Sequence, residues 1–184
     1  MRVISGNAKG RTLKAVPGMS TRPTTDKVKE AIFSMIGPYF DGGQVLDLFA
    51  GTGGLGIEAL SRGISKAVFI DVEKKSVDTV HANLQSTGYK DQAEVYRNDA
   101  ARALKVLAKR EQKFDLVFLD PPYKMKVIAE LITTMEELGL LSSDVFIVAE
   151  HDAGDILPEA IGELEQQRRS EYGETAVTIY TRIS

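Results

Sequence analysis

The chain has 184 residues, of which 43% are hydrophobic and 27% are charged, as expected of one folded globular domain. It contains no cysteine, which excludes a disulfide framework, thiolate metal sites and a cysteine nucleophile. Two histidines are too few for a histidine-rich site, so we expect no bound metal. The apolar runs are too short to span a bilayer, and no apolar signal core opens the chain. We therefore expect a cytoplasmic protein without membrane contact, and we expect it to be a monomer.

Charge is unevenly distributed along the chain. Residues 1–30 hold seven Lys or Arg side chains against Asp26 and Glu30, a net charge of +5, whereas the remaining residues carry −8. A basic leading segment on an acidic body favours a localised contact with a polyanion such as a nucleic acid. A solvated basic arm without a ligand is the alternative interpretation, because basic surface patches are common.

The first predicted elements are a small hairpin and a helix. Val3-Ile4 and Leu13–Val16 flank a turn rich in glycine, asparagine and lysine, which is typical of a hairpin. Thr24, Thr25 and Asp26 then form a capping signal before an apolar stripe with helical spacing. The stripe consists of Val28, Ala31, Ile32, Met35 and Ile36.

From residue 44 onward, short apolar runs alternate with amphipathic segments. The predicted strands are Gln44–Phe49, Ala67–Asp71, Ala93–Arg97, Phe114–Leu119 and Val145–Glu150. This alternation predicts right-handed crossovers and a mostly parallel sheet with helices on both faces. Leu164–Glu171 and Thr175–Ile183 surround a short turn and predict an antiparallel terminal hairpin. The expected fold is therefore α/β, with a mostly parallel seven-stranded sheet.

A glycine-rich loop follows the first of these strands. Gly51, Gly53 and Gly56 match the pattern G-x-G-x-x-G where a strand turns into a helix. Such glycines permit a tight turn and let a ligand approach the backbone, while the helix start offers free amide donors. Asp71 ends the next strand, where a carboxylate can accept hydrogen bonds from ribose hydroxyls. Taken alone, these features support an NAD-type site and an S-adenosylmethionine site almost equally.

The residues before the glycines favour the S-adenosylmethionine site. Asp47 stands four residues before Gly51, within a D-x-F-A-G-x-G pattern that resembles motif I of S-adenosylmethionine-dependent methyltransferases. The resemblance implies that the loop approaches the amino-acid end of the cofactor, that Asp71 holds the ribose, and that Asp99 faces the adenine amino group. Asp99 is also placed to cap the following helix. The candidate cofactor-binding residues are Asp47, Phe49, Gly51, Gly53, Gly56, Asp71 and Asp99, with Arg22 and Thr24 as further candidates.

The fourth predicted strand ends in Asp120-Pro121-Pro122-Tyr123. In an open parallel sheet, the carboxyl ends of the strands form the ligand crevice, so this tetrapeptide is expected beside the glycine loop. Two prolines remove two backbone donors and leave the Asp120 carboxylate and the Pro121 carbonyl as acceptors. Two acceptors suit a planar exocyclic amine, on which Tyr123 would stack. The tetrapeptide resembles motif IV of methyltransferases that modify exocyclic amines of nucleobases.

The whole arrangement is similar to the RsmD family, bacterial methyltransferases that act on the 2-amino group of a guanine in 16S ribosomal RNA. The resemblance covers essentially all 184 residues. It implies a Rossmann-like class I methyltransferase fold over residues 24–184, a basic β-hairpin extension over residues 1–23, and S-adenosylmethionine as the cofactor, converted to S-adenosylhomocysteine. The implied partner is 16S ribosomal RNA within the small subunit or an assembly intermediate. The residues that match the basic segment are Arg2, Lys9, Arg11, Lys14 and Arg22.

Three other functions remain as alternatives. A DNA adenine-N6 methyltransferase shares the Pro-Pro-aromatic site, but such enzymes usually need an added target-recognition region, for which this chain has little spare length. An NAD-dependent oxidoreductase would leave Asp120–Tyr123 without an evident role in hydride transfer. A non-catalytic RNA-binding module that retains a cofactor pocket is the third alternative.

Overall fold

A computed structural model describes residues 1–18, 24–122 and 126–183. Its helices are α1 (Asp26–Ile36), α2 (Gly54–Ser61), α3 (Lys74–Thr87), α4 (Ala100–Lys109) and α5 (Ile128–Glu137), with a short 3-10 turn at Lys90–Gln92. Its strands are β1 (Gln44–Asp47), β2 (Lys66–Asp71), β3 (Ala93–Arg97), β4 (Phe114–Leu119), β5 (Leu141–Asp152), β6 (Ala160–Ile161), β7 (Leu164–Tyr172) and β8 (Thr175–Arg182). In this described part of the chain, no helix has the length and apolar character needed to cross a membrane.

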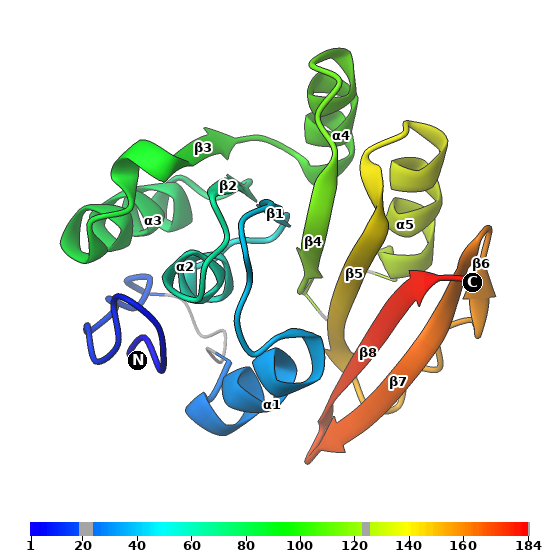
Figure 1. The fold of residues 1–184 in the computed structure, drawn as a ribbon, viewed down its shortest axis with the longest axis horizontal. Coiled ribbons are helices and arrows are strands. Elements are labelled where there is room, and N and C mark those ends of the chain that lie inside the picture. The colour runs from blue at the N-terminus through cyan, green and yellow to red at the C-terminus, as the bar shows by residue number, and fades with distance from the viewer. Residues whose placement is uncertain (19–23, 123–125, 184) are drawn as a thin grey trace.

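The strands form one mixed sheet in the order β3-β2-β1-β4-β5-β8-β7-β6 (Figure 1). The first five strands are parallel, and β8, β7 and β6 join in antiparallel fashion. The predicted α/β class and the antiparallel end of the sheet are confirmed. Over the described residues the sheet has eight strands rather than the expected seven, because Ala160–Ile161 adds a short edge strand opposite the start of β7. Two residues are too few to give a strand pattern in the sequence.

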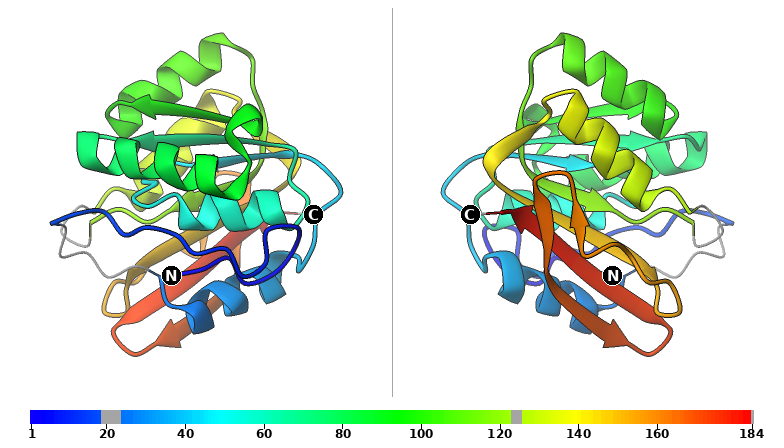
Figure 2. Two further views of the ribbon diagram at one scale, coloured as in Figure 1. Left: turned by 90° about the vertical axis from the view of Figure 1, so that its left-hand side faces the viewer. Right: turned by 90° about the vertical axis from the view of Figure 1, so that its right-hand side faces the viewer.

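Helices cover both faces of the sheet, and each face has its own hydrophobic core (Figure 2). One core joins α1, α2 and α3 to the sheet through side chains such as Phe33, Ile57 and Val80. The other joins α4 and α5 through Leu104 and Ile132. Because the central strands are buried on both sides, they read in the sequence as continuous apolar runs. This three-layer packing fixes the strand ends relative to one another.

Two residues from the predicted capping signals, Thr25 and Asp99, cap helices in the structure. The side chain of Thr25 accepts a hydrogen bond from the Val28 N–H and caps α1, which begins at Asp26. Asp99 caps α4 by accepting the N–H of Arg102 at 3.1 Å. Both residues satisfy a backbone donor that the first helical turn leaves without an intrahelical partner.

The amino-terminal segment, residues 1–16, differs from a regular hairpin. It contains one antiparallel bridge, between Arg2 and Thr12, and its turn lies against α2 (Figure 2). The Asn7 N–H donates to the Ser61 carbonyl at 2.8 Å, and the Ala8 N–H donates to Ser61 Oγ at 2.9 Å. A side chain at Gly6 would collide with the Ser61 carbonyl oxygen, so glycine is required for this close approach. These contacts draw the turn onto α2, which explains why the hairpin ladder is not extended.

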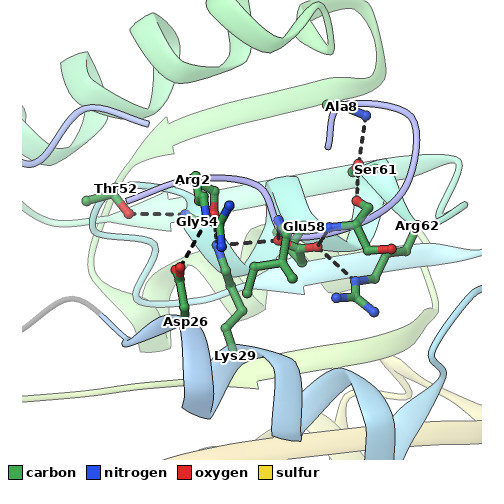
Figure 3. Close-up of polar contacts among 12 residues, drawn as sticks. Arg2, Ala8, Asp26, Lys29, Thr52, Gly54, Glu58, Ser61 and Arg62 are labelled. Atoms are coloured by element: carbon green, nitrogen blue, oxygen red, sulfur yellow. Dashed lines mark hydrogen bonds and ion pairs between the residues drawn. The ribbon is translucent and has the colours of Figure 1, made fainter. Parts of the chain in front are cut away.

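A buried carboxylate anchors this segment to the helices (Figure 3). Glu58 of α2 is fully buried and accepts the backbone N–H groups of Ile4 and Ser5 at 2.9 and 3.0 Å. It also forms ion pairs with Lys29 of α1 at 3.4 Å and with Arg62 at 2.8 Å. Burial lowers the pKa of Lys29, and the Glu58 carboxylate opposes this effect. Glu58 thus joins the amino-terminal segment, α1 and α2 at one point.

We expect Glu58→Ala to destabilise the protein strongly, because it leaves two buried cations and two backbone donors without their acceptor. The expected loss is about 3–5 kcal/mol in the free energy of unfolding, measured by urea denaturation. Asp78→Ala is the matched control, because it removes an exposed ion pair with Lys74 and should cost less than about 1 kcal/mol. Equal losses in the two variants would contradict the anchoring role of Glu58.

Candidate active site

Four acidic residues lie at the carboxyl ends of the parallel strands. Asp47 ends β1, Asp71 ends β2, Asp120 directly follows β4, and Glu150 lies near the end of β5. Parallel pairing places Asp47 beside Phe69 and Phe118, and Leu119 beside Ala149, so these strand ends lie at one edge of the sheet. This is the edge at which open α/β sheets bind their ligands. The sequence prediction that the glycine loop and the Asp120 tip adjoin is consistent with this arrangement.

The glycine loop turns sharply between β1 and α2. Gly51 and Gly53 both have positive φ angles, 57° and 81°, in the left-handed region that favours glycine. The loop is tied down at its start, where the Ala50 N–H donates to the Ile70 carbonyl at 2.9 Å. Gly56 sits against β2, because an added Cβ would lie 2.4 Å from a ring carbon of Phe69. The loop conformation therefore depends on these glycines.

Asp71 supports the glycine loop from the neighbouring strand. Its Oδ2 accepts the Gly51 N–H and its Oδ1 accepts the Glu73 N–H, both at 2.9 Å. Each carboxylate oxygen keeps a second lone pair for a ligand. Among the described residues other than Gly51 and its two chain neighbours, no heavy atom lies within 4 Å of the position that a Cβ at Gly51 would occupy. Acceptors and open space thus occur together at the end of β2, as a ligand with hydroxyl groups requires.

Asp47 lies beneath the loop and is 2% exposed. The pKa of its carboxyl is raised to about 8, mainly by burial and to a smaller extent by the negative charges of Asp71 and Glu150, while the N–H of Gly56 acts in the opposite direction. That N–H donates to Asp47 Oδ2 at 3.1 Å. Asp47 therefore holds the first turn of α2 in place, and its carboxyl keeps its proton to higher pH than an exposed aspartate does.

Asp120 and the two prolines form the tip of β4. Pro121 is buried and Pro122 is exposed, and neither has an N–H, so the turn offers acceptors rather than donors. Burial raises the pKa of the Asp120 carboxyl well above its ordinary value, and the nearby charges of Glu150 and Asp47 act in the same direction. Tyr123, predicted to stack on a base, lies outside the described residues.

Glu150 is a site residue that the sequence motifs did not reveal. It is 7% exposed, and its carboxyl lies close enough to that of Asp120 to raise the pKa of Asp120. Thr24, which precedes α1, donates its hydroxyl to Glu150 Oε1 at 3.0 Å. In the sequence, the signal that could have indicated Glu150 is its position as an acidic residue at the end of a predicted apolar strand. Thr24 thus reaches the same edge of the sheet, and the cap of α1 is the next residue, Thr25.

The remaining candidate cofactor residues are spread more widely. Phe49 is half-buried and packs against the core beneath α4 and α5. Asp99 is exposed and its carboxylate is engaged in capping α4. Arg22 lies outside the described residues. Among those that are described, no three His, Asp or Glu side chains converge as metal ligands would.

The basic segment presents its side chains to solvent. Arg2, Lys9, Arg11 and Lys14 are all exposed, and Arg2 pairs with Asp26 at 3.1 Å. The backbone of Lys14 is held by Asn83 of α3, whose side-chain amide also donates to the Thr52 carbonyl in the glycine loop at 2.8 Å. Asn83 therefore couples the end of the basic segment to the loop.

Two hollows lie outside the cluster of carboxyls. A groove of about 260 Å³ runs between Lys14–Pro17 and α3. A second hollow, of about 370 Å³, lies at the opposite end of the sheet from the four acidic residues, near the start of β1 at Gln44. The lining of this second hollow includes Tyr39, Asp115 and Asp144. Neither hollow contains any of the four acidic residues that end the parallel strands.

Comparison with known proteins agrees with these features. The family model described as conserved hypothetical protein 95 matches residues 1–181. A Bacillus subtilis protein provisionally named rRNA methyltransferase YlbH is 58% identical over 182 residues, covering 99% of both chains. Ribosomal RNA small subunit methyltransferase D of Escherichia coli K12 is 31% identical, covering 99% of this chain and 90% of its own. A solved structure of a conserved hypothetical protein from Streptococcus pyogenes is 42% identical with a TM-score of 0.81, covering 85% of this chain and 96% of its own. The chain therefore belongs to the conserved hypothetical protein 95 family, the family of the RsmD proteins that its motifs resemble.

Proposed function

We propose that this protein transfers a methyl group from S-adenosylmethionine to the exocyclic 2-amino group of a guanine in 16S ribosomal RNA. The observation that carries the proposal is the position of the Asp120 carboxyl and the two prolines at the end of β4, next to the strand that leads into the glycine loop. The proposed substrate is the RNA within the small subunit or an assembly intermediate. The relatives named as rRNA methyltransferases support this substrate class.

The tip of β4 suits an aromatic amine. One N–H of the amine donates to the Asp120 carboxylate and the other donates to the Pro121 carbonyl. Because both hydrogens are held, the nitrogen lone pair is directed away from the two acceptors. The main task of the protein is then alignment of nitrogen and methyl carbon at about 3–3.5 Å. The amine can lose its extra proton after attack, so a separate strong base is not required.

The glycine loop and Asp71 fit the cofactor. Asp71 has acceptor capacity for ribose hydroxyls, and the open space over Gly51 admits a ligand against the backbone. The buried carboxyl of Asp47 keeps the loop in the required conformation. When bound, S-adenosylmethionine supplies a sulfonium methyl group that is already a strong electrophile.

The basic segment supports an RNA partner. Its exposed Lys and Arg side chains can contact phosphates, and its end at Lys14 lies close to the glycine loop through Asn83. Unpaired loop bases are the accessible targets in RNA, because the deep major groove of an A-form helix excludes side chains. The alternative of DNA adenine methylation is not favoured, because the relatives that match nearly the whole chain carry rRNA names.

Gly51→Ala tests the cofactor site. The new methyl group enters open space where the cofactor would lie, so we expect at least about a tenfold loss of affinity for S-adenosylhomocysteine, measured by isothermal titration calorimetry. Gly88→Ala is the matched control, because Gly88 also has a positive φ and open surroundings but caps the far end of α3. Both variants should lose about 1 kcal/mol of stability, and only Gly51→Ala should lose affinity. Unchanged affinity in Gly51→Ala would contradict this cofactor position.

Asp120→Asn tests the catalytic tip. The amide keeps one oxygen acceptor but loses the negative charge and the second acceptor, so its hydrogen bond to the amine is weaker and we expect kcat to fall by about tenfold to a hundredfold. The variant removes a desolvated acid, so its stability should not decrease. The assay is transfer of labelled methyl groups to small subunits from a strain lacking this gene, followed by nucleoside analysis.

The wild-type protein should yield 2-methylguanosine in 16S ribosomal RNA. Recovery of 6-methyladenine would support adenine methylation instead, and label in protein alone would contradict the proposal that RNA is the substrate. Wild-type protein that binds RNA and transfers no methyl group would indicate a non-catalytic binding module.

The double variant Lys9→Ala/Arg11→Ala tests the RNA contact. Loss of two phosphate contacts should raise KM for RNA, leave kcat unchanged, and reduce the slope of log affinity against log salt concentration by about two. Lys105→Ala/Lys109→Ala removes the same charge from α4 on the opposite face and should change neither quantity. Equal effects of the two double variants would show that only net charge matters.

A further inference from the structure

The pairing of Asp120 with Glu150 adds a feature to the proposed chemistry. Strands β4 and β5 are parallel neighbours with Leu119 opposite Ala149, so the next residues along the two strands are adjacent. The two side chains lie close enough for a hydrogen bond between their carboxyls, which raises the pKa of Asp120 and opposes the effect of burial on Glu150. Glu150 also accepts the hydroxyl of Thr24 at 3.0 Å. A hydrogen bond between two carboxyl groups requires a proton, because two carboxylates are acceptors only.

Among the described residues, the surroundings of the pair supply no cation that neutralises it. Asp47 from β1 adds a carboxyl that raises the pKa of Asp120, and Asp71 and Glu150 act on Asp47 in the same direction. Thr24, before α1, is a neutral donor. Within the described residues, no Lys or Arg forms an ion pair with Asp120 or Glu150.

The elements on the other side of β5 contribute no charge to the pair. The partner of Glu150 on β8 is Val177, and the adjacent His151 is hydrogen-bonded to Thr178 and to the Asp152 carbonyl. Lys29 of α1 is directed to Glu58. Burial raises the pKa of both Asp120 and Glu150. The pair therefore retains one proton under conditions in which ordinary carboxyls have lost theirs.

We propose that Glu150 is a positioning residue that shares a proton with Asp120 and so controls when Asp120 can accept the amine N–H of the substrate. This inference rests on the proposed function. While the proton lies on Asp120, its O–H donates to Glu150 and one acceptor site at the tip of β4 is blocked. Loss of that proton leaves Asp120 as a carboxylate with both oxygens available, and Glu150 then limits its movement through the neighbouring strand.

The direction of the pH dependence follows from this arrangement. Activity should rise with pH as the pair loses its shared proton. In Glu150→Gln, one negative charge is absent and the amide can donate to the Asp120 carboxylate, so both changes lower the pKa of Asp120. In Thr24→Val, the ionised form of Glu150 loses its hydroxyl donor, so the pair holds its proton to higher pH. The two variants should therefore shift the acid limb of activity in opposite directions.

The experiment compares these variants with wild type in two measurements. The first is the pH profile of kcat for methyl transfer to small subunits, and the second is the titration of the Asp120 carboxyl carbon by NMR in protein bound to S-adenosylhomocysteine. We expect Glu150→Gln to move both midpoints to lower pH by about one unit and Thr24→Val to move both to higher pH. Glu165→Gln, which removes an exposed carboxyl on β7, should leave both midpoints at the wild-type value.

Unchanged midpoints in Glu150→Gln would overturn the inference, as would a shift of the same sign in both variants. A shift in the NMR midpoint without a shift in the kcat profile would also overturn it, because the shared proton would then have no effect on the reaction. Wild-type protein that shows the paired titration but methylates no RNA would instead overturn the proposed function and, with it, the role of Glu150. The NMR readout thus separates the two failures.

Discussion

The proposed chemistry depends on the electrostatic environment at the carboxyl ends of four parallel strands. The sheet brings Asp47, Asp71, Asp120 and Glu150 to one edge. Burial raises the pKa of Asp47, Asp120 and Glu150 there, and neighbouring carboxylates add to this effect for Asp47 and Asp120. Isolated buried carboxylates are costly, so each of these groups is held by specific hydrogen bonds or keeps a proton. The same environment is suited to N–H and O–H donors of a ligand. A site rich in acceptors is what an amine substrate and a ribose both require.

The amino-terminal segment is part of the same packing. Val3, Ala8 and Leu13 belong to the core that contains α1, α2 and α3. Glu58 fixes one end of the segment and Asn83 fixes the other, close to the glycine loop. The basic side chains therefore project from a backbone that is held against the domain. An RNA bound there would have a defined position relative to the edge of the sheet.

Local patterns in the sequence were sufficient to predict the main helices and strands. Strands β3 and β4 have the predicted boundaries, and Thr25 and Asp99 cap the helices that their positions indicated. The glycine spacing correctly indicated a tight turn, because positive φ and close packing leave few other residues acceptable. These features depend on residues that are close together in the chain.

Features that depend on distant residues could not be predicted in this way. Thr24 and Glu150 are 126 positions apart, and Lys14 and Asn83 are 69 positions apart, so no local pattern relates them. The strand β5 begins four residues earlier than predicted. Its first residues include the exposed polar side chains of Ser143 and Asp144, which interrupt the apolar pattern from which a buried strand is predicted. The irregular amino-terminal hairpin likewise results from contacts with Ser61, which the segment itself does not encode.

The most direct measurement is a crystal structure of the protein with S-adenosylhomocysteine and a guanine-containing RNA fragment. The account predicts that the 2-amino nitrogen of the guanine lies within hydrogen-bond distance, about 2.9 Å, of an Asp120 carboxylate oxygen and of the Pro121 carbonyl, with the sulfur of the ligand beyond the nitrogen lone pair. A guanine bound elsewhere, or a tip of β4 that contacts neither the base nor the glycine-loop ligand, would contradict it.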